Sequence, residues 1–141
     1  MKGWYKTSDG DKVILESTDI IRLIYKGIIE LVIPNGVKEV NCSNNSNLTK
    51  LIIPDSVEFI YCRNNKLTKL DLPDGIKRVY CYNNQLTKLD IPDSVNCINC
   101  RYNQLTELIV PDNCIVECDP GVKVITRTMF NRSNRLKNLL K

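Results

Sequence analysis

A short unit recurs along almost the whole chain, and its period limits the folds that the chain can adopt. Prolines mark this period, the first two twenty residues apart and the later ones nineteen apart: Pro34, Pro54, Pro73, Pro92 and Pro111. Aligned on these prolines, three successive units read VEFIYCRNNKLTKLDLPDG, IKRVYCYNNQLTKLDIPDS and VNCINCRYNQLTELIVPDN. Such self-similarity predicts a solenoid, in which each unit forms one coil, or rung, and stacks only on its neighbours.

Less regular units extend the array in both directions. A unit with one extra residue begins at Val37, a degenerate unit begins at Thr18, and a shortened unit spans 114–125. We therefore expect about six rungs over residues 18–125. A chain of 141 residues suits one domain, so the prediction is a single domain over 1–141.

The alternation of side chains shows which residues of a rung are buried. Ile60 and Cys62 lie on one side of the expected strand, and Tyr61 lies on the other. Apolar residues of the next segment, such as Leu67 and Leu70, close the rung around a single file of side chains. The prediction is a β-rich solenoid with a parallel β-sheet on one face and turn or extended segments on the other. Asparagines at the strand ends are expected to satisfy backbone groups of the turns: Asn65, Asn84 and Asn103.

The segments outside the array are predicted to cover its ends. Residues 1–17 hold a Ser-Asp-Gly-Asp turn between two apolar stretches, which predicts a β-hairpin cap over the first rung. Residues 126–141 place apolar residues among basic ones. This pattern predicts a short amphipathic helix that closes the last rung.

The pattern Val57-x-x-Ile60-x-Cys62-x-x-Asn65-x-Leu67 resembles the leucine-rich repeat consensus, with Cys at one of the buried leucine positions. The unit is similar to short bacterial and viral repeats of the form N-x-L-T-x-L-x-[LIV]-P. Such repeats occur in secreted bacterial E3 ligase effectors and in free-standing arrays of phages and large DNA viruses. The resemblance implies a parallel sheet backed by extended or turn segments. Those effectors carry their catalytic cysteine in a large separate domain that is not expected here, so ligase activity is not implied.

The cysteines are expected to be reduced and mostly structural. The N-terminus lacks an export signal, so the seven cysteines predict free thiols in the cytoplasm, or in the host cytoplasm for a viral protein. Most of them fall at the inward position of successive rungs: Cys42, Cys62, Cys81, Cys100 and Cys118. Cys97 and Cys114 fall outside this row and are expected to be the more reactive thiols.

Metal binding and catalysis are not expected. Cys97-x2-Cys100 and Cys114-x3-Cys118 have spacings typical of zinc sites, but Cys97 and Cys100 face opposite sides of one strand. The absence of histidine excludes Ser-His-Asp and Cys-His arrangements within the chain. A filled core leaves no deep pocket, and there is no phosphate loop. We expect no enzyme activity, no cofactor, no metal and no small-molecule substrate. No apolar run approaches eighteen residues, so no membrane association is predicted.

The outward side of the expected sheet carries the candidate binding residues. Tyr and Arg, the residue types enriched in interface hot spots, gather there on adjacent rungs. The predicted partner-binding residues are Phe59, Tyr61, Arg63, Arg78, Tyr80, Tyr82, Asn99, Arg101 and Tyr102. The favoured function is the binding of a protein partner, in a viral, phage or bacterial host-interaction setting. The alternative for these side chains is cross-strand stacking that only stabilises an exposed sheet.

Two other functions remain open. The net charge of +4 and the basic residues of the tail suit a nucleic-acid-associated protein: Arg127, Arg132, Arg135, Lys137 and Lys141. A structural or self-assembly module, which associates through an open end of the sheet, is the other possibility.

Overall fold

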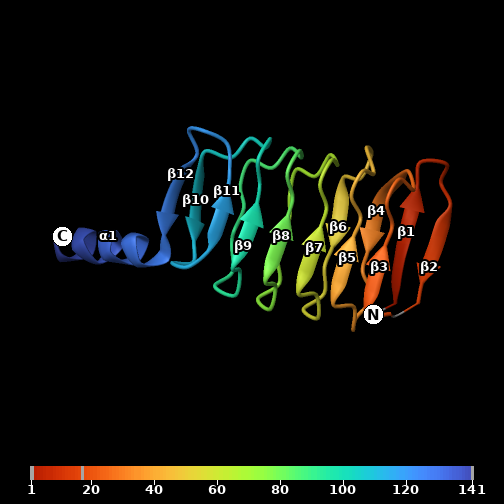
Figure 1. The fold of residues 1–141 in the computed structure, drawn as a ribbon, viewed down its shortest axis with the longest axis horizontal. Coiled ribbons are helices and arrows are strands. Elements are labelled where there is room, and N and C mark those ends of the chain that lie inside the picture. Colours follow the sequence, from red (N-terminus) through yellow and green to blue (C-terminus); the bar gives the residue numbers. More distant parts are fainter. Residues whose placement is uncertain (1, 17, 141) are drawn as a thin grey trace.

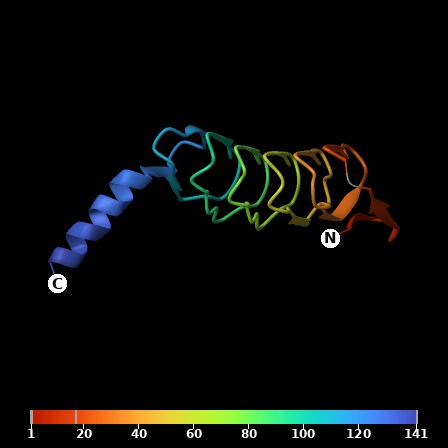
Figure 2. The same ribbon diagram turned by 90° about the horizontal axis from the view of Figure 1, so that it is seen from below.

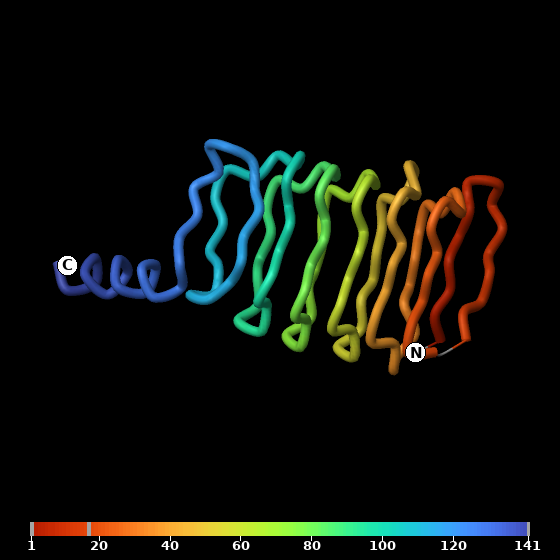
Figure 3. Tube along the Cα trace, viewed as in Figure 1, coloured from red at the N-terminus to blue at the C-terminus, as the bar shows by residue number. Residues whose placement is uncertain are grey.

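The computed structural model describes residues 2–16 and 18–140. Met1, Ser17 and Lys141, which bound the predicted end segments 1–17 and 126–141, lie outside the described residues. The repeats stack into an elongated β-solenoid of about six turns, followed by one helix (Figure 1). The tube in Figure 3 shows the coils side by side along the long axis. This arrangement confirms the predicted β-rich solenoid with parallel sheets.

One face of the solenoid is a six-stranded parallel sheet, which receives one short strand from each rung. Its order is β11-β9-β8-β7-β5-β3. The strands are β3 (Ile20–Arg22), β5 (Glu39–Asn41), β7 (Phe59–Tyr61), β8 (Arg78–Tyr80), β9 (Cys97–Asn99) and β11 (Ile115–Glu117). The register has no slip in the centre, since Tyr61 lies opposite Tyr80 and Tyr80 opposite Asn99. We call the outward side of this sheet the strand face.

The opposite face is extended backbone in the middle and short strands towards the ends. The strands are β4 (Ile28–Val32) and β6 (Lys50–Ile52) near the N-terminus, and β10 (Glu107–Val110) and β12 (Lys123–Thr126) near the C-terminus. In the middle rungs, the Gln85 amide donates to the Leu67 carbonyl at 2.9 Å, and the Gln104 amide to the Leu86 carbonyl at 2.8 Å. The prediction of extended backbone on this face thus holds for the middle rungs, while both ends form ladders.

The predicted N-terminal hairpin is present. It consists of β1 (Gly3–Thr7) and β2 (Lys12–Leu15), which pair in antiparallel fashion. β1 also pairs with β4, so the hairpin extends the sheet of the opposite face and caps it. β3, the first strand of the six-stranded sheet, remains an edge strand.

The predicted C-terminal helix is present, but it does not close the last rung. Helix α1 (Arg127–Leu139) has no buried residue and projects beyond the end of the solenoid (Figure 2). Its first turn is held against the solenoid, because Asp112 accepts hydrogen bonds from the amide and the hydroxyl of Thr128. Thr126 caps the helix, and Arg127 donates to the Ile91 carbonyl at 2.7 Å. These bonds hold the start of the helix at the turn edge and direct the rest away from the core.

No helix in the described part of the chain is long and apolar enough to cross a membrane.

The core is a single file of apolar side chains, as the alternation predicted. Each central rung contributes fully or nearly fully buried residues such as Ile60, Leu67 and Leu70. The cysteines of the inward row stack within this file, and Cys42, Cys62, Cys81 and Cys100 are all buried.

Buried asparagines join successive rungs. The side-chain amide of Asn84 donates to the carbonyls of Cys62 and Cys81, both at 2.9 Å, and its oxygen accepts from the Leu67 amide at 3.0 Å. Asn65 and Asn103 each bond the cysteine carbonyls of two rungs in the same way. The predicted role of these asparagines is therefore confirmed, and it extends to bonds between rungs.

Candidate functional site

The centre of the strand face is an ordered cluster of aromatic rings. Because β7 and β8 pair in register, the rings of Tyr61 and Tyr80 stack with centroids 5.1 Å apart and planes 8° from parallel. The Tyr80 hydroxyl lies 3.8 Å from Sγ of Cys97 on the next strand. Both tyrosines are half-buried, and the stacking covers one face of each ring. Packing between rungs thus holds these rings in fixed orientations.

Arginines flank the aromatic pair on both sides. Nη1 of Arg63 donates to the Tyr82 hydroxyl at 2.7 Å, and its guanidinium lies 5.6 Å from the centre of that ring. The guanidinium of Arg78 lies 5.8 Å from the ring of Phe59 on the adjacent strand. Cation–π contacts of this kind hold a long side chain in place without neutralising its charge.

The structure brings most of the predicted binding residues together. Six of them form the contacts described above: Phe59, Tyr61, Arg63, Arg78, Tyr80 and Tyr82. Asn99 belongs to the same sheet but donates to the Glu117 carboxylate at 2.7 Å, towards the last rung. Arg101 and Tyr102 follow β9 on the adjoining turn and are exposed. The cluster is therefore centred on β7 and β8, with these last residues at its margin.

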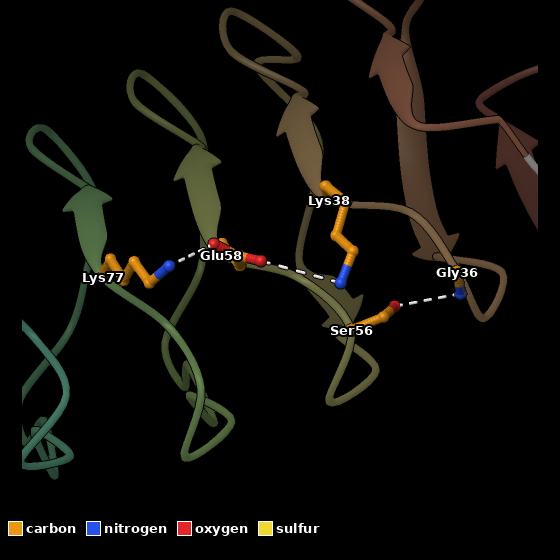
Figure 4. A network of polar contacts seen from close by, with 5 residues as sticks. All are labelled: Gly36, Lys38, Ser56, Glu58 and Lys77. Atoms are coloured by element: carbon orange, nitrogen blue, oxygen red, sulfur yellow. Dashed lines mark hydrogen bonds and ion pairs between the residues drawn. The ribbon is translucent and has the colours of Figure 1, made fainter.

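Charged side chains at the strand starts form a paired rim beside this cluster (Figure 4). Nζ of Lys77 lies 2.5 Å from one carboxylate oxygen of Glu58, and Nζ of Lys38 lies 3.6 Å from the other. In the neighbouring turns, the Gly36 amide donates to the Ser56 hydroxyl at 3.0 Å. The hydrogen bond from Lys77 is the main reason that the pKa of Glu58 lies below its ordinary value. Because Lys38 and Lys77 share the one carboxylate of Glu58, the rim keeps a net positive charge.

Two exposed tyrosines mark the turns that follow the strands. Tyr102 and Tyr25 have positive φ angles of 55° and 56°, and their exposed fractions are 68% and 77%. The equivalent turns of the intervening rungs hold asparagine at this conformation, at Asn44, Asn64 and Asn83. The left-handed region suits asparagine and disfavours an aromatic residue, so these tyrosines are not explained by local backbone preference.

Tyr25 was not among the residues predicted from the sequence. The signal for it lies in the repeat alignment, which places Tyr25 at the position of Asn44, one residue before the expected ladder asparagine. At the turn position where the other repeats have asparagine with a positive φ, an aromatic residue indicates an exposed side chain.

The cysteines provide no metal site. All seven are free thiols, and among residues 2–16 and 18–140 no three His, Cys, Asp or Glu side chains cluster so as to hold a metal ion. Burial raises the pKa of Cys42 and of Cys100 to about 12, and it raises the pKa values of Cys62 and Cys81 as well. The buried row therefore stays protonated at neutral pH.

Of the two cysteines outside the buried row, Cys114 is partly buried. Burial, followed by the neighbouring Cys97, raises the pKa of Cys114 to about 11. Since the thiolate is the reactive form, Cys114 reacts slowly at neutral pH. Cys114 is still more exposed than the buried row, and its greater reactivity relative to that row stays a prediction.

A hollow of about 550 Å³ lies away from the strand face, beside the start of α1, with Thr87 and Ile109 in its lining. Several of its charged residues are paired: Asp90 with Lys88, Glu107 with Lys123, and Arg127 with Asp93. The hollow adds nothing to the case for the strand face.

Comparisons with known proteins leave these observations to stand alone. No protein-family model, curated protein or solved structure matches the chain. Any functional conclusion rests on the geometry of the strand face and of the two ends.

Proposed function

We propose that the chain is a non-enzymatic protein-binding module, a short leucine-rich repeat solenoid that holds a partner protein against its strand face. The observation that carries the proposal is the ordered cluster at its centre, in which Tyr61 and Tyr80 stack between two arginine–aromatic pairs. Tyr and Arg are the residues that most often dominate protein–protein interfaces.

The rigidity of the cluster favours binding. Association costs free energy when flexible side chains become ordered at the interface, roughly 0.5–1.5 kcal/mol for each. Here the rings and the guanidinium groups are already ordered by their neighbours on adjacent rungs. Purely structural stacking would explain the contacts themselves. It does not explain the exposed Tyr102 beside them, whose backbone conformation disfavours an aromatic residue.

The test is affinity capture followed by binding measurements with purified components. The wild-type chain and the double variant Tyr61→Ala/Tyr80→Ala are used to capture proteins from the native host. Each captured protein is then purified and titrated against both chains. We expect a one-to-one complex whose dissociation constant rises at least about 30-fold in the variant, the effect of losing a hot spot of about 2 kcal/mol.

The matched control changes two exposed residues on the opposite face, Lys69→Ala/Lys88→Ala, and is expected to bind as the wild type does. Circular dichroism checks that both variants keep the fold. Equal affinity of the Tyr61→Ala/Tyr80→Ala variant and the wild type would refute the strand face as the binding surface. Binding of DNA or RNA with a steep dependence on salt would favour the nucleic-acid alternative.

A further inference from the structure

Helix α1 carries an apolar stripe that nothing in the described part of the chain covers. Met129, Leu136 and Leu140 are spaced by seven and four residues, so they lie along one side of the helix. Their exposed fractions are 62%, 61% and 88%, and Leu139 beside them is 75% exposed. An isolated helix of this length is marginal in water unless an apolar side packs against something. The stripe therefore points to a contact outside the single chain.

The end of the solenoid from which α1 projects is also uncovered. β11 and β12 are the outermost strands of their sheets, so each presents a free edge. Ile115 on β11 is 65% exposed and Val124 on β12 is 42% exposed. At the opposite end, the β1–β2 hairpin packs on β4 and carries charged residues such as Lys12, which lies over the Trp4 ring at 4.3 Å. The C-terminal end has no comparable cover among the described residues.

Helix and open end have complementary charge. Residues 127–140 hold four basic side chains and no acidic one. The last rung holds Glu117 and Asp119, whose carboxylates accept from neutral donors: Glu117 from the Asn99 amide, and Asp119 from the backbone amides of Tyr102 and Asn103. A hydrogen bond from a neutral donor leaves the negative charge uncompensated. The basic helix and the acidic rung thus attract each other, but within one chain the helix points away from that rung (Figure 2).

We propose that two copies of this chain associate end to end through a two-fold axis at the last rung, with α1 of each copy lying on the open end of the other. A two-fold contact requires a surface that complements itself. The C-terminal end meets this condition, since it presents both an apolar basic helix and an apolar acidic rung. Under the two-fold axis, the helix of each copy contacts the last rung of the other copy.

The helix and the sheet ends are the surfaces available for the contact. A helix of 13 residues is about 20 Å long. A stable interface buries roughly 800 Å² per partner, and the two helices with the two sheet ends are the surfaces that would supply this area. Each helix also covers the exposed edges of β11 and β12 in the other copy. The proposal does not depend on the function of the strand face.

The test is a mass measurement by light scattering over a micromolar concentration series. We expect the wild-type chain to reach twice its 16.2 kDa mass. Leu136→Glu/Leu140→Glu places two charges in the exposed stripe, so it leaves the monomer folded and raises the dimer dissociation constant at least about 100-fold. The matched control, Val13→Glu/Ile14→Glu, changes two exposed apolar residues at the other end and keeps the wild-type constant.

A second measurement uses only the wild-type chain. Hydrogen exchange at high and low concentration is expected to show protection of the amides of β11 and α1 in the dimer, while the amides of β2 exchange alike at both concentrations. A chain that stays monomeric throughout, a dimer that the helix variant leaves intact, or an open series of larger species would each overturn the proposal. Tyr61→Ala/Tyr80→Ala is expected to dimerise as the wild type does, which separates this contact from the strand face.

Discussion

At the residue scale, the buried asparagines link the rungs more specifically than the apolar core does. Apolar side chains in a single file tolerate exchange for others of similar volume. Asn84 instead bonds two carbonyls and one amide belonging to two rungs. Its loss would leave the buried Leu67 amide without a partner, at roughly 1–3 kcal/mol, while the carbonyls of Cys62 and Cys81 would keep only their bonds from Asn65 and Asn103. These asparagines therefore fix how far each rung is displaced from the one before it.

The same scale shows where sequence reasoning succeeds and where it stops. Inward residues such as Ile60 and Cys62 follow from alternation alone, because a strand has only two sides. The contact of Arg63 with Tyr82 could not be predicted, since it depends on the rotamers of two long side chains on neighbouring rungs. Tyr25 was missed because its meaning depends on a backbone angle, which the alignment indicates only indirectly.

Glu58 gives the fold a specific dependence on pH. Its pKa is lowered chiefly by the hydrogen bond from Lys77, with a smaller contribution from Lys38. A lowered pKa in the folded state means that the ionised carboxylate stabilises the fold. This contribution is present above the ordinary glutamate pKa of about 4.3 and is lost as the pH falls through the lowered value.

The expected result for Glu58→Gln is a slightly lower melting temperature at neutral pH and a difference from the wild type that shrinks as the pH falls below about 4. Thermal unfolding at several pH values measures it. Asp71→Asn is the matched control, since its partner Lys69 lies only two residues away and both side chains are largely exposed. A Glu58→Gln difference that is constant from acid to neutral pH would contradict the assignment.

At the scale of the element, the turn after each strand depends on a left-handed residue. Asn44, Asn64 and Asn83 occupy it in the middle rungs, and their side chains form a ladder, with Asn64 donating to Asn44 at 2.6 Å and Asn83 donating to Asn64 at 2.9 Å. Tyr102 takes the same backbone conformation in the next rung. A left-handed conformation costs an ordinary residue about 1–2 kcal/mol, and asparagine less.

Tyr102→Asn is therefore expected to stabilise the fold by roughly 0.5–1.5 kcal/mol, because asparagine relieves the backbone cost. Denaturant unfolding measures the change. The variant is also expected to weaken binding of a partner held on the strand face, so that stability rises as affinity falls. Tyr82→Asn is the matched control: Tyr82 is half-buried under Arg63, and its loss should not stabilise the chain. A Tyr102→Asn variant no more stable than the wild type would refute the argument from backbone strain.

The type of element at each end could be predicted from the sequence, but its position relative to the solenoid could not. Turn residues between apolar stretches identified the β1–β2 hairpin, and apolar residues among basic ones identified α1. The direction of α1 depends on the bonds from Thr128 to Asp112 and from Arg127 to the Ile91 carbonyl. These bonds join residues 16 and 36 positions apart, and periodicity contains no information about such pairs.

At the scale of the whole molecule, the repeat period alone determines the architecture. A rung buries too little surface to be stable by itself, so each depends on the rungs above and below it. The middle rungs have two neighbours, whereas the last rung has one, and its side chains Cys118 and Val116 are only half-buried. Stability should therefore fall from the centre of the solenoid towards its C-terminal end.

The buried cysteine row allows this gradient to be measured thiol by thiol. Burial raises the pKa values of Cys42, Cys62, Cys81 and Cys100, so none of them reacts appreciably until its rung opens. In a dilute, monomeric sample at neutral pH, a thiol reagent followed by peptide mass analysis should modify the inward row in a fixed order, with Cys118 first, then Cys100, and Cys62 and Cys81 last. In denaturant all seven cysteines should react at similar rates, which gives the reference for intrinsic reactivity. Equal protection of Cys62, Cys81 and Cys100 would mean instead that the solenoid opens only as one cooperative unit, and that nearest-neighbour stacking does not govern its stability.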